Sequence, residues 1–234
     1  MSLPATTFYC SRCNFNDGDV GTWGMKEYVL PNNVRIVVNR SLGWCDDCEG
    51  VVSVELFSEE ACLRDIQQAE QSLTASGQRP RRIWWQLHRF IFHRAWQGYV
   101  TNWERRHFRL TCDLDDAKDS LTHLRQRLNP PRCLACGSKK IRAPLVANAE
   151  AWENMEQPKP IGFIHPGCGG ELWMYQDGLR IGLRPSVSYY TPEGDLIDNE
   201  EVDGYTTASS EYFEERDKAN AIGRGREVPV EDVM

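Results

Sequence analysis

Four short pairs of metal-ligating residues constrain the fold of this chain more than any other feature of its sequence. In each pair two residues separate the ligands, so one tight turn can direct both side chains at a single ion. A tetrahedral metal site needs two such turns, and four pairs therefore predict two sites. The pairs are Cys10 with Cys13, Cys45 with Cys48, Cys133 with Cys136, and His165 with Cys168.

The intervals between the pairs favour sites formed in chain order. Thirty-one residues separate Cys13 from Cys45, and 28 separate Cys136 from His165, each enough for a hairpin or two. Four protein ligands leave no position for water, which is typical of a structural ion. We therefore predict two structural zinc ions, one held by Cys10, Cys13, Cys45 and Cys48, and the other by Cys133, Cys136, His165 and Cys168.

Iron binding and redox activity are the alternatives to zinc for the paired cysteines. Iron also suits four thiolates, although a histidine in the second set favours zinc. A redox dithiol usually sits singly at the start of a helix beside a βαβ pattern, and these pairs lack that setting. Both alternatives stay open at this point.

The redox compartment bears on this choice. The chain has no apolar run of about 20 residues, and its first residues resemble no secretory signal. We therefore expect a cytoplasmic protein, and in a reducing compartment paired cysteines indicate metal sites more often than disulfides.

The last two pairs resemble the turns of the zinc-ribbon superfamily. The matching stretches are Cys133-Leu-Ala-Cys136-Gly137 and His165-Pro-Gly-Cys168-Gly169-Gly170, in which glycine follows the last ligand. The resemblance implies hairpins that carry the turns and clamp one zinc between them. The first two pairs depart from the pattern, because Asn14 and Glu49 occupy the glycine position. Nothing specific about a partner or an activity follows from the resemblance.

Apolar periodicity predicts an α+β protein: two small antiparallel-β zinc ribbons flanking a three-helix insertion, with a short C-terminal sheet extension and an acidic tail. Alternating residues such as Val34, Ile36 and Val38 indicate strands in the ribbons. The insertion has helical spacing from an N-cap at Ser58 to Gly77, then over about 81–108 and 113–128. The predicted parts are a zinc ribbon at 1–57, the helical insertion at 58–130, a zinc ribbon with a β extension at 131–200, and a flexible tail at 201–234.

Charge is unevenly distributed along the chain. The whole sequence has a formal charge of −7. Residues 79–109 contain eight arginines and one acid, for a local charge of +7, whereas residues 189–234 contain 13 acids and 4 bases, for −9. The acidic end has few apolar side chains, and it is therefore predicted to be flexible.

The arginine-rich stretch is predicted to be a helix with apolar residues on two nearly opposite faces. One face can pack against the third helix. The other combines aromatic rings with neighbouring arginines, and it supplies the candidate partner-binding residues: Arg81, Arg82, Trp85, Arg89, Phe92, Trp96, Tyr99, Trp103, Arg105 and Arg106.

Several functions are compatible with this face. Arginine beside aromatic rings suits nucleic acid, through phosphate pairing and base stacking, and this is our first interpretation. The same residues are favoured at protein interfaces, which makes a protein adaptor or inhibitor the main alternative. A membrane surface also attracts a basic helix with tryptophans. Alternatively, the second aromatic stripe packs within the chain, and the arginines form a solvated rim.

No catalytic residue is predicted. The sequence contains no phosphate-binding glycine loop, no nucleophile elbow and no His-Glu-x-x-His motif. The spacing of Arg82 and His88 is similar to the Arg-to-His motif of HEPN ribonucleases, which leaves an RNA-cleaving enzyme as a remote alternative.

Overall fold

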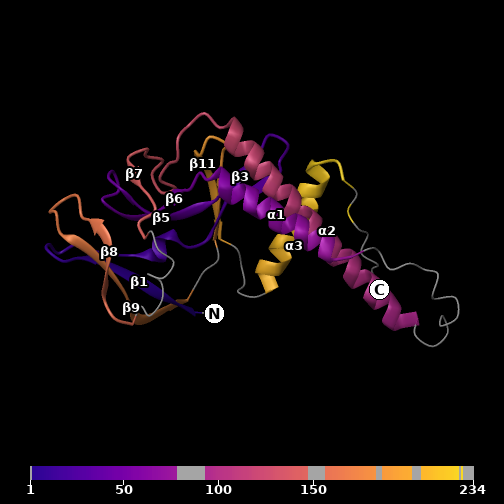
Figure 1. Ribbon diagram of the computed structural model, residues 1–234, viewed down its shortest axis with the longest axis horizontal. Coiled ribbons are helices and arrows are strands. Elements are labelled where there is room, and N and C mark those ends of the chain that lie inside the picture. Colours follow the sequence, from indigo (N-terminus) through magenta and orange to yellow (C-terminus); the bar gives the residue numbers. More distant parts are fainter. Residues whose placement is uncertain are drawn as a thin grey trace. The chain divides into compact units, whose positions relative to one another are not determined.

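The computed structural model describes residues 2–77, 93–146, 156–182, 186–201, 207–226 and 228. These residues form three α-helices and several small sheets, which confirms the predicted α+β class (Figure 1). The chain divides into two compact units, each assembled from separate stretches of sequence. The first comprises Met1–Leu30, Val37–Phe57 and Arg127–Tyr212, and the second comprises Pro31–Ile36, Ser58–Gln126 and Phe213–Met234.

The largest strand pairing in the first unit joins the beginning of the chain to its last third. Strand β1 (Ser2–Cys10) lies between β2 (Asn16–Gly18) and β9 (Glu171–Gly182), and β8 (Lys159–Ile164) completes this antiparallel sheet. Phe8 lies opposite Met174 in the register. The two ends predicted to form separate ribbons are therefore hydrogen-bonded to each other.

The remaining strands form two further sheets. A three-stranded antiparallel sheet has the order β6 (Gly50–Glu55), β5 (Arg40–Cys45), β7 (Ile141–Arg142). The other sheet has the strand order β11 (Leu196–Glu201), β10 (Ser186–Tyr190), β3 (Met25–Val29), β4 (Arg35–Val37). Strands β10 and β11 are antiparallel, whereas β10 and β3 are parallel. A short 3-10 helix, η1 (Asp19–Thr22), links β2 to β3.

The hydrophobic core of the first unit lies against one face of the β1–β9 sheet. Phe8, Leu172 and Met174 are fully buried there, together with Trp44 from β5. Full burial of such a side chain stabilises a fold by about 1.5–3 kcal/mol. Half-buried Cys13 and Cys168 pack against the same core, so the metal-ligating turns are continuous with it.

A buried ion pair lies elsewhere in the first unit. The guanidinium of Arg127 donates to both carboxylate oxygens of Glu55, at 2.7 and 2.8 Å, and both side chains are 0% exposed. The hydroxyl of Tyr28 donates to Glu55 at 2.6 Å, and Arg127 stacks on the Phe57 ring at 4.7 Å. Burial, followed by the nearby Glu55 carboxylate, raises the pKa of Tyr28. The pair thus fastens Arg127 to the end of strand β6.

Helices α1 (Glu59–Ala75) and α2 (His93–Gln126) belong to the second unit. The predicted N-cap is confirmed, since the Ser58 hydroxyl accepts the backbone N–H of Ala61 at 3.1 Å. The predicted break between the second and third helices is wrong, because α2 runs unbroken through residues 108–113. Residues 109–112 contain no proline or glycine, so nothing there interrupts the backbone ladder. Neither α1 nor any other described helix is long and apolar enough to span a membrane.

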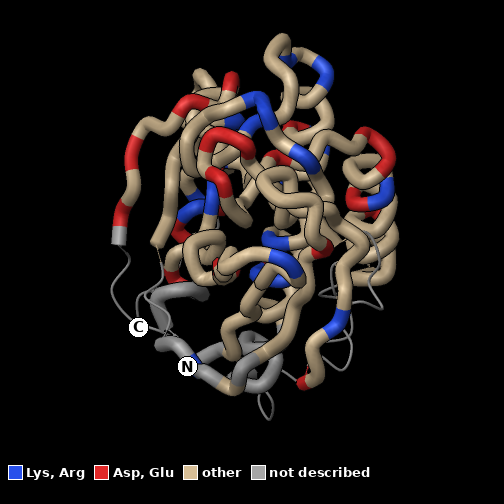
Figure 2. Tube along the Cα trace, turned by 90° about the vertical axis from the view of Figure 1, so that its left-hand side faces the viewer, with Lys and Arg blue, Asp and Glu red and all other residues tan. Residues whose placement is uncertain are grey.

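The predicted flexible tail is wrong over Thr207–Gly223, which form helix α3. Asn220 is 0% exposed, and its amide exchanges two hydrogen bonds with the backbone of Arg35, at 2.7 and 2.8 Å. Arg216 and Arg224 both bind Asp116 of α2, at 3.0 and 2.6 Å. Hydrogen bonds and ion pairs therefore hold α3 in place, although the segment has few apolar side chains to bury. Acidic and basic residues are interspersed along the described trace (Figure 2).

Candidate metal centres

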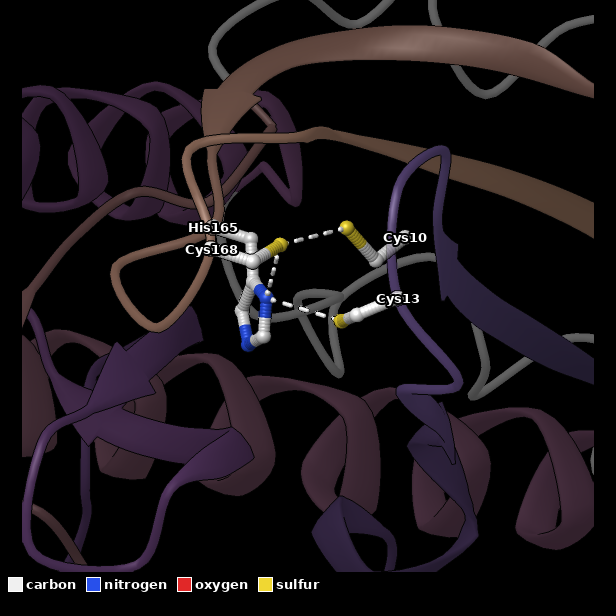
Figure 3. A group of neighbouring side chains, drawn as sticks. All are labelled: Cys10, Cys13, His165 and Cys168. Atoms are coloured by element: carbon white, nitrogen blue, oxygen red, sulfur yellow. Dashed lines mark hydrogen bonds between the residues drawn. The ribbon is translucent and has the colours of Figure 1, made fainter.

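Three cysteines and one histidine converge at the first centre, here called the mixed cluster (Cys10, Cys13, His165 and Cys168; Figure 3). Cys10 ends β1, whereas His165 and Cys168 lie in the turn between β8 and β9. The sulfurs of Cys10 and Cys168 are 3.3 Å apart. Nδ1 of His165 lies 3.4 Å from the sulfur of Cys13 and 3.2 Å from that of Cys168. Nδ1 rather than Nε2 is therefore the fourth candidate ligand.

The backbone of both turns supports these ligands. The N–H of Arg12 lies 3.4 Å from the sulfur of Cys10, and that of Gly170 lies 3.4 Å from the sulfur of Cys168. Hydrogen bonds of this kind favour the thiolate that a metal requires. A Cβ at Gly170 would lie 2.6 Å from the sulfur of Cys10, so glycine is needed there. This contact gives the reason for the second glycine after the last ligand.

Aromatic rings fix the orientation of His165. The ring of Phe15 lies 4.9 Å from the imidazole, and that of Trp44 meets it edge-on at 5.1 Å. Trp44 is only 3% exposed, and it directly precedes Cys45, a ligand of the other centre. Trp44 therefore contacts one ligand of the first centre and is next in sequence to a ligand of the second.

The second centre consists of cysteines alone and is here called the all-cysteine cluster (Cys45, Cys48, Cys133 and Cys136). Cys45 ends β5, and Cys48 lies in the turn before β6. The sulfur of Cys136 lies 3.6 Å from that of Cys45, and the sulfur of Cys133 lies 3.8 Å from that of Cys48. Burial raises the pKa of the Cys133 thiol to about 11, so binding of a metal to that sulfur must release a proton at neutral pH.

The prediction that the pairs combine in chain order is wrong. The first pair combines with the last and the two inner pairs combine with each other, so the sites are nested. Strand pairing gives the physical reason. Strand β1 pairs with β9, which brings Cys10 beside the turn that carries Cys168, and β5 pairs with β7, which brings Cys45 beside the segment after Cys136.

The donor atoms fit zinc. In each cluster all four ligand atoms lie within 4.8 Å of one another. Tetrahedral zinc with Zn–S bonds of about 2.3 Å requires sulfurs about 3.8 Å apart, close to the separations found here. All eight predicted ligands therefore fall into two groups that could hold metal ions, compatible with zinc.

Comparison of the chain with protein-family models, curated proteins and solved structures found no match. The assignment of the two clusters thus depends on the donor types and the geometry described above. Neither a family nor a relative adds a partner or an activity.

The structure describes only part of the predicted partner-binding face. Its first residues lie outside the described residues: Arg81, Arg82, Trp85, Arg89 and Phe92, together with His88 of the remote ribonuclease motif. Trp96 and Tyr99 lie on α2, but their side chains are also outside the described part. Trp103, Arg105 and Arg106 are described.

Trp103 makes contacts within its own unit. Its indole N–H donates to the backbone oxygen of Ser76 at 3.1 Å, and its ring stacks on His107 with centroids 4.6 Å apart. Since Ser76 caps the end of α1, Trp103 fastens the two helices together. The alternative in which aromatic residues pack within the chain therefore holds for this residue.

Sequence reasoning missed the ion pairs beside the all-cysteine cluster. Lys140 donates to Asp47 at 2.8 Å, and Arg142 donates to Asp46 at 3.2 Å. The Lys140 ammonium lowers the pKa of Asp47 through a hydrogen bond. A signal was present in the sequence, because two acids stand between Cys45 and Cys48 while bases follow Cys136.

Proposed function

We propose that this chain is a non-catalytic protein with two structural zinc ions that binds nucleic acid through the arginine-rich part of its long helix. Each cluster offers four protein ligands, and a catalytic zinc would keep one position for water. Zinc in this protein therefore stabilises the first unit, and the binding surface belongs to the second.

The nucleic-acid proposal is carried by two arginines on α2 that are exposed and form no ion pair with a described residue. Arg105 and Arg106 are exposed, and neither forms an ion pair with any described residue. By contrast, Arg109, Arg125 and Arg224 each pair with an acid of the second unit, namely Glu214, Glu59 and Asp119. An exposed arginine that pairs with none of the described acids can bind a phosphate.

The preceding sequence contains more residues of the kinds that bind nucleic acid. Arg81, Arg82 and Arg89 belong to the same arginine-rich stretch, together with Trp85 and Phe92. Guanidinium groups with aromatic rings bind single-stranded nucleic acid by phosphate pairing and base stacking. Because Trp103 is engaged with Ser76 and not free to serve as an interface anchor, the described residues favour nucleic acid over a protein partner.

Removal of charge at Arg105 and Arg106 tests the proposal. Arg105→Gln and Arg106→Gln are each expected to make the salt dependence of binding to a mixed-sequence single-stranded oligonucleotide shallower, by about 0.7 in the slope of log K against log salt concentration. Fluorescence anisotropy over a salt series measures this slope. Arg64→Gln, which removes one exposed charge from α1, is expected to leave the slope unchanged.

The alternatives give other results. Absence of binding to DNA and RNA by the wild-type chain at low salt contradicts the proposal. A partner whose binding is lost on alanine substitution of the aromatic residues, with little dependence on salt, identifies a protein interface instead.

A further inference from the structure

The two clusters differ in how far their cysteine residues are exposed to solvent. In the mixed cluster Cys10 is 6% and His165 is 9% exposed, and the other two ligands are half-buried against the core. In the all-cysteine cluster Cys48 and Cys136 are exposed, although Cys45 and Cys133 are 0% exposed. An oxidant in solution thus reaches two residues of the all-cysteine cluster directly.

The number of thiolates also favours reaction at the all-cysteine cluster. Four thiolates with one Zn²⁺ carry a charge of −2, whereas three thiolates and a neutral imidazole with Zn²⁺ carry −1. The thiolate is the nucleophilic form of cysteine, and the all-cysteine cluster offers one more of them. In addition, the rings of Phe15 and Trp44 both contact His165, which shields that part of the mixed cluster.

We propose that the all-cysteine cluster is a thiol-modification site, at which Cys48 and Cys136 react with peroxides and release the zinc, while the mixed cluster keeps its ion. This inference rests on the zinc-binding part of the proposed function and is independent of nucleic-acid binding. The two centres then have different roles: the mixed cluster is a permanent structural site, and the all-cysteine cluster is a reversible one.

The reaction needs only a peroxide as co-reactant. An exposed thiolate attacks one oxygen of hydrogen peroxide, the O–O bond breaks, and the products are a sulfenic acid and hydroxide. A second thiolate of the cluster, within 4.8 Å, attacks the sulfenic sulfur, forms the disulfide and expels another hydroxide. Two thiolates are oxidised by two electrons and the peroxide is reduced. Zn²⁺ leaves because two of its four ligands are lost, and a thiol reductant with zinc restores the site.

Treatment of the zinc-loaded full chain with hydrogen peroxide tests the proposal. A chromogenic chelator follows zinc release, and mass mapping after thiol labelling identifies the oxidised cysteines. We expect one zinc per chain to be released at least about tenfold faster than the other. The disulfide is expected to contain Cys48 or Cys136, while Cys10, Cys13 and Cys168 remain labelled as free thiols.

One variant distinguishes the effect of cysteine exposure from the effect of cluster charge on zinc release. His165→Cys gives the mixed cluster four thiolates at a position that is buried in the wild-type chain, so the cluster that contains Cys48 is still expected to lose its zinc first. Buried Cys62 and Cys112 serve as internal controls that remain reduced.

The outcomes are distinct. Equal rates of release for the two ions, or oxidation of Cys10, Cys13 or Cys168 before Cys48 and Cys136, overturns the inference. A purified chain that binds no zinc at either cluster overturns the proposed zinc function itself.

Discussion

Replacement of Cys133 by serine is expected to remove one of the two metal ions and to lower the free energy of unfolding of the first unit by several kcal/mol. Cys133 is fully buried, and its cluster joins the turn between β5 and β6 to a segment 85 residues further along the chain. Structural zinc contributes on the order of 10 kcal/mol in finger-sized peptides, and loss of one ligand forfeits much of this. Metal analysis and urea denaturation measure the two effects.

The same variant is expected to leave the other cluster loaded. With nested sites, Cys133→Ser leaves the mixed cluster complete, and one ion per chain remains bound to Cys10, Cys13, His165 and Cys168. Cys62→Ser, which alters a buried thiol of α1 outside both clusters, is the control and should retain two ions. Two ions retained by Cys133→Ser would contradict its role as a ligand.

Arg127→Met is expected to destabilise the first unit by about 3–5 kcal/mol, because it leaves the Glu55 carboxylate buried without its cation. Neither side chain of the pair is exposed, and Glu55 also accepts the Tyr28 hydroxyl and the N–H of Arg132. Thermal or urea unfolding measures the loss.

A neighbouring pair supplies the control for Arg127→Met. Arg125 binds Glu59 with both side chains at least half exposed, and Arg125→Met should cost less than about 1 kcal/mol. The double variant Arg127→Met with Glu55→Leu should recover part of the stability, since both charges are then absent. Equal losses for Arg127→Met and Arg125→Met would contradict a role for burial.

The ligands of both sites could be predicted from the sequence, because ligand spacing is a local property. Two residues between ligands set the geometry of one turn, and every predicted pair does meet a second pair. Ser58 as an N-cap is equally local and is confirmed. The combination of pairs is not local, since it depends on which strands hydrogen-bond.

Loop length is a poor guide to that combination. Closure entropy grows only slowly with loop length, so a short interval between pairs gives little preference for chain order. The pairing of β1 with β9 and the core around Phe8 and Met174 decide the outcome instead. Charge complementarity of Asp47 with Lys140 and of Asp46 with Arg142 is the better signal.

Helix α3 escapes prediction for a related reason. Many charges and few apolar residues usually indicate a flexible segment, but here Arg216 and Arg224 bind Asp116, and Asn220 binds the backbone of Arg35. A sequence pattern gives the number of charges in a segment, but it does not give the residues with which they pair in the fold. The predicted division of the long helix after residue 108 is a different case, because residues 109–112 contain no helix-breaking residue and α2 continues through them.

Cadmium NMR of the metal-substituted chain tests the nested arrangement most directly. A spin-active cadmium isotope in each site couples to the β-protons of the cysteines that bind it, so correlation spectra assign each cysteine to an ion. Nested sites predict two cadmium signals, one correlated with Cys10, Cys13 and Cys168 and the other with Cys45, Cys48, Cys133 and Cys136. A single signal shared by Cys10, Cys13, Cys45 and Cys48 would contradict the structure.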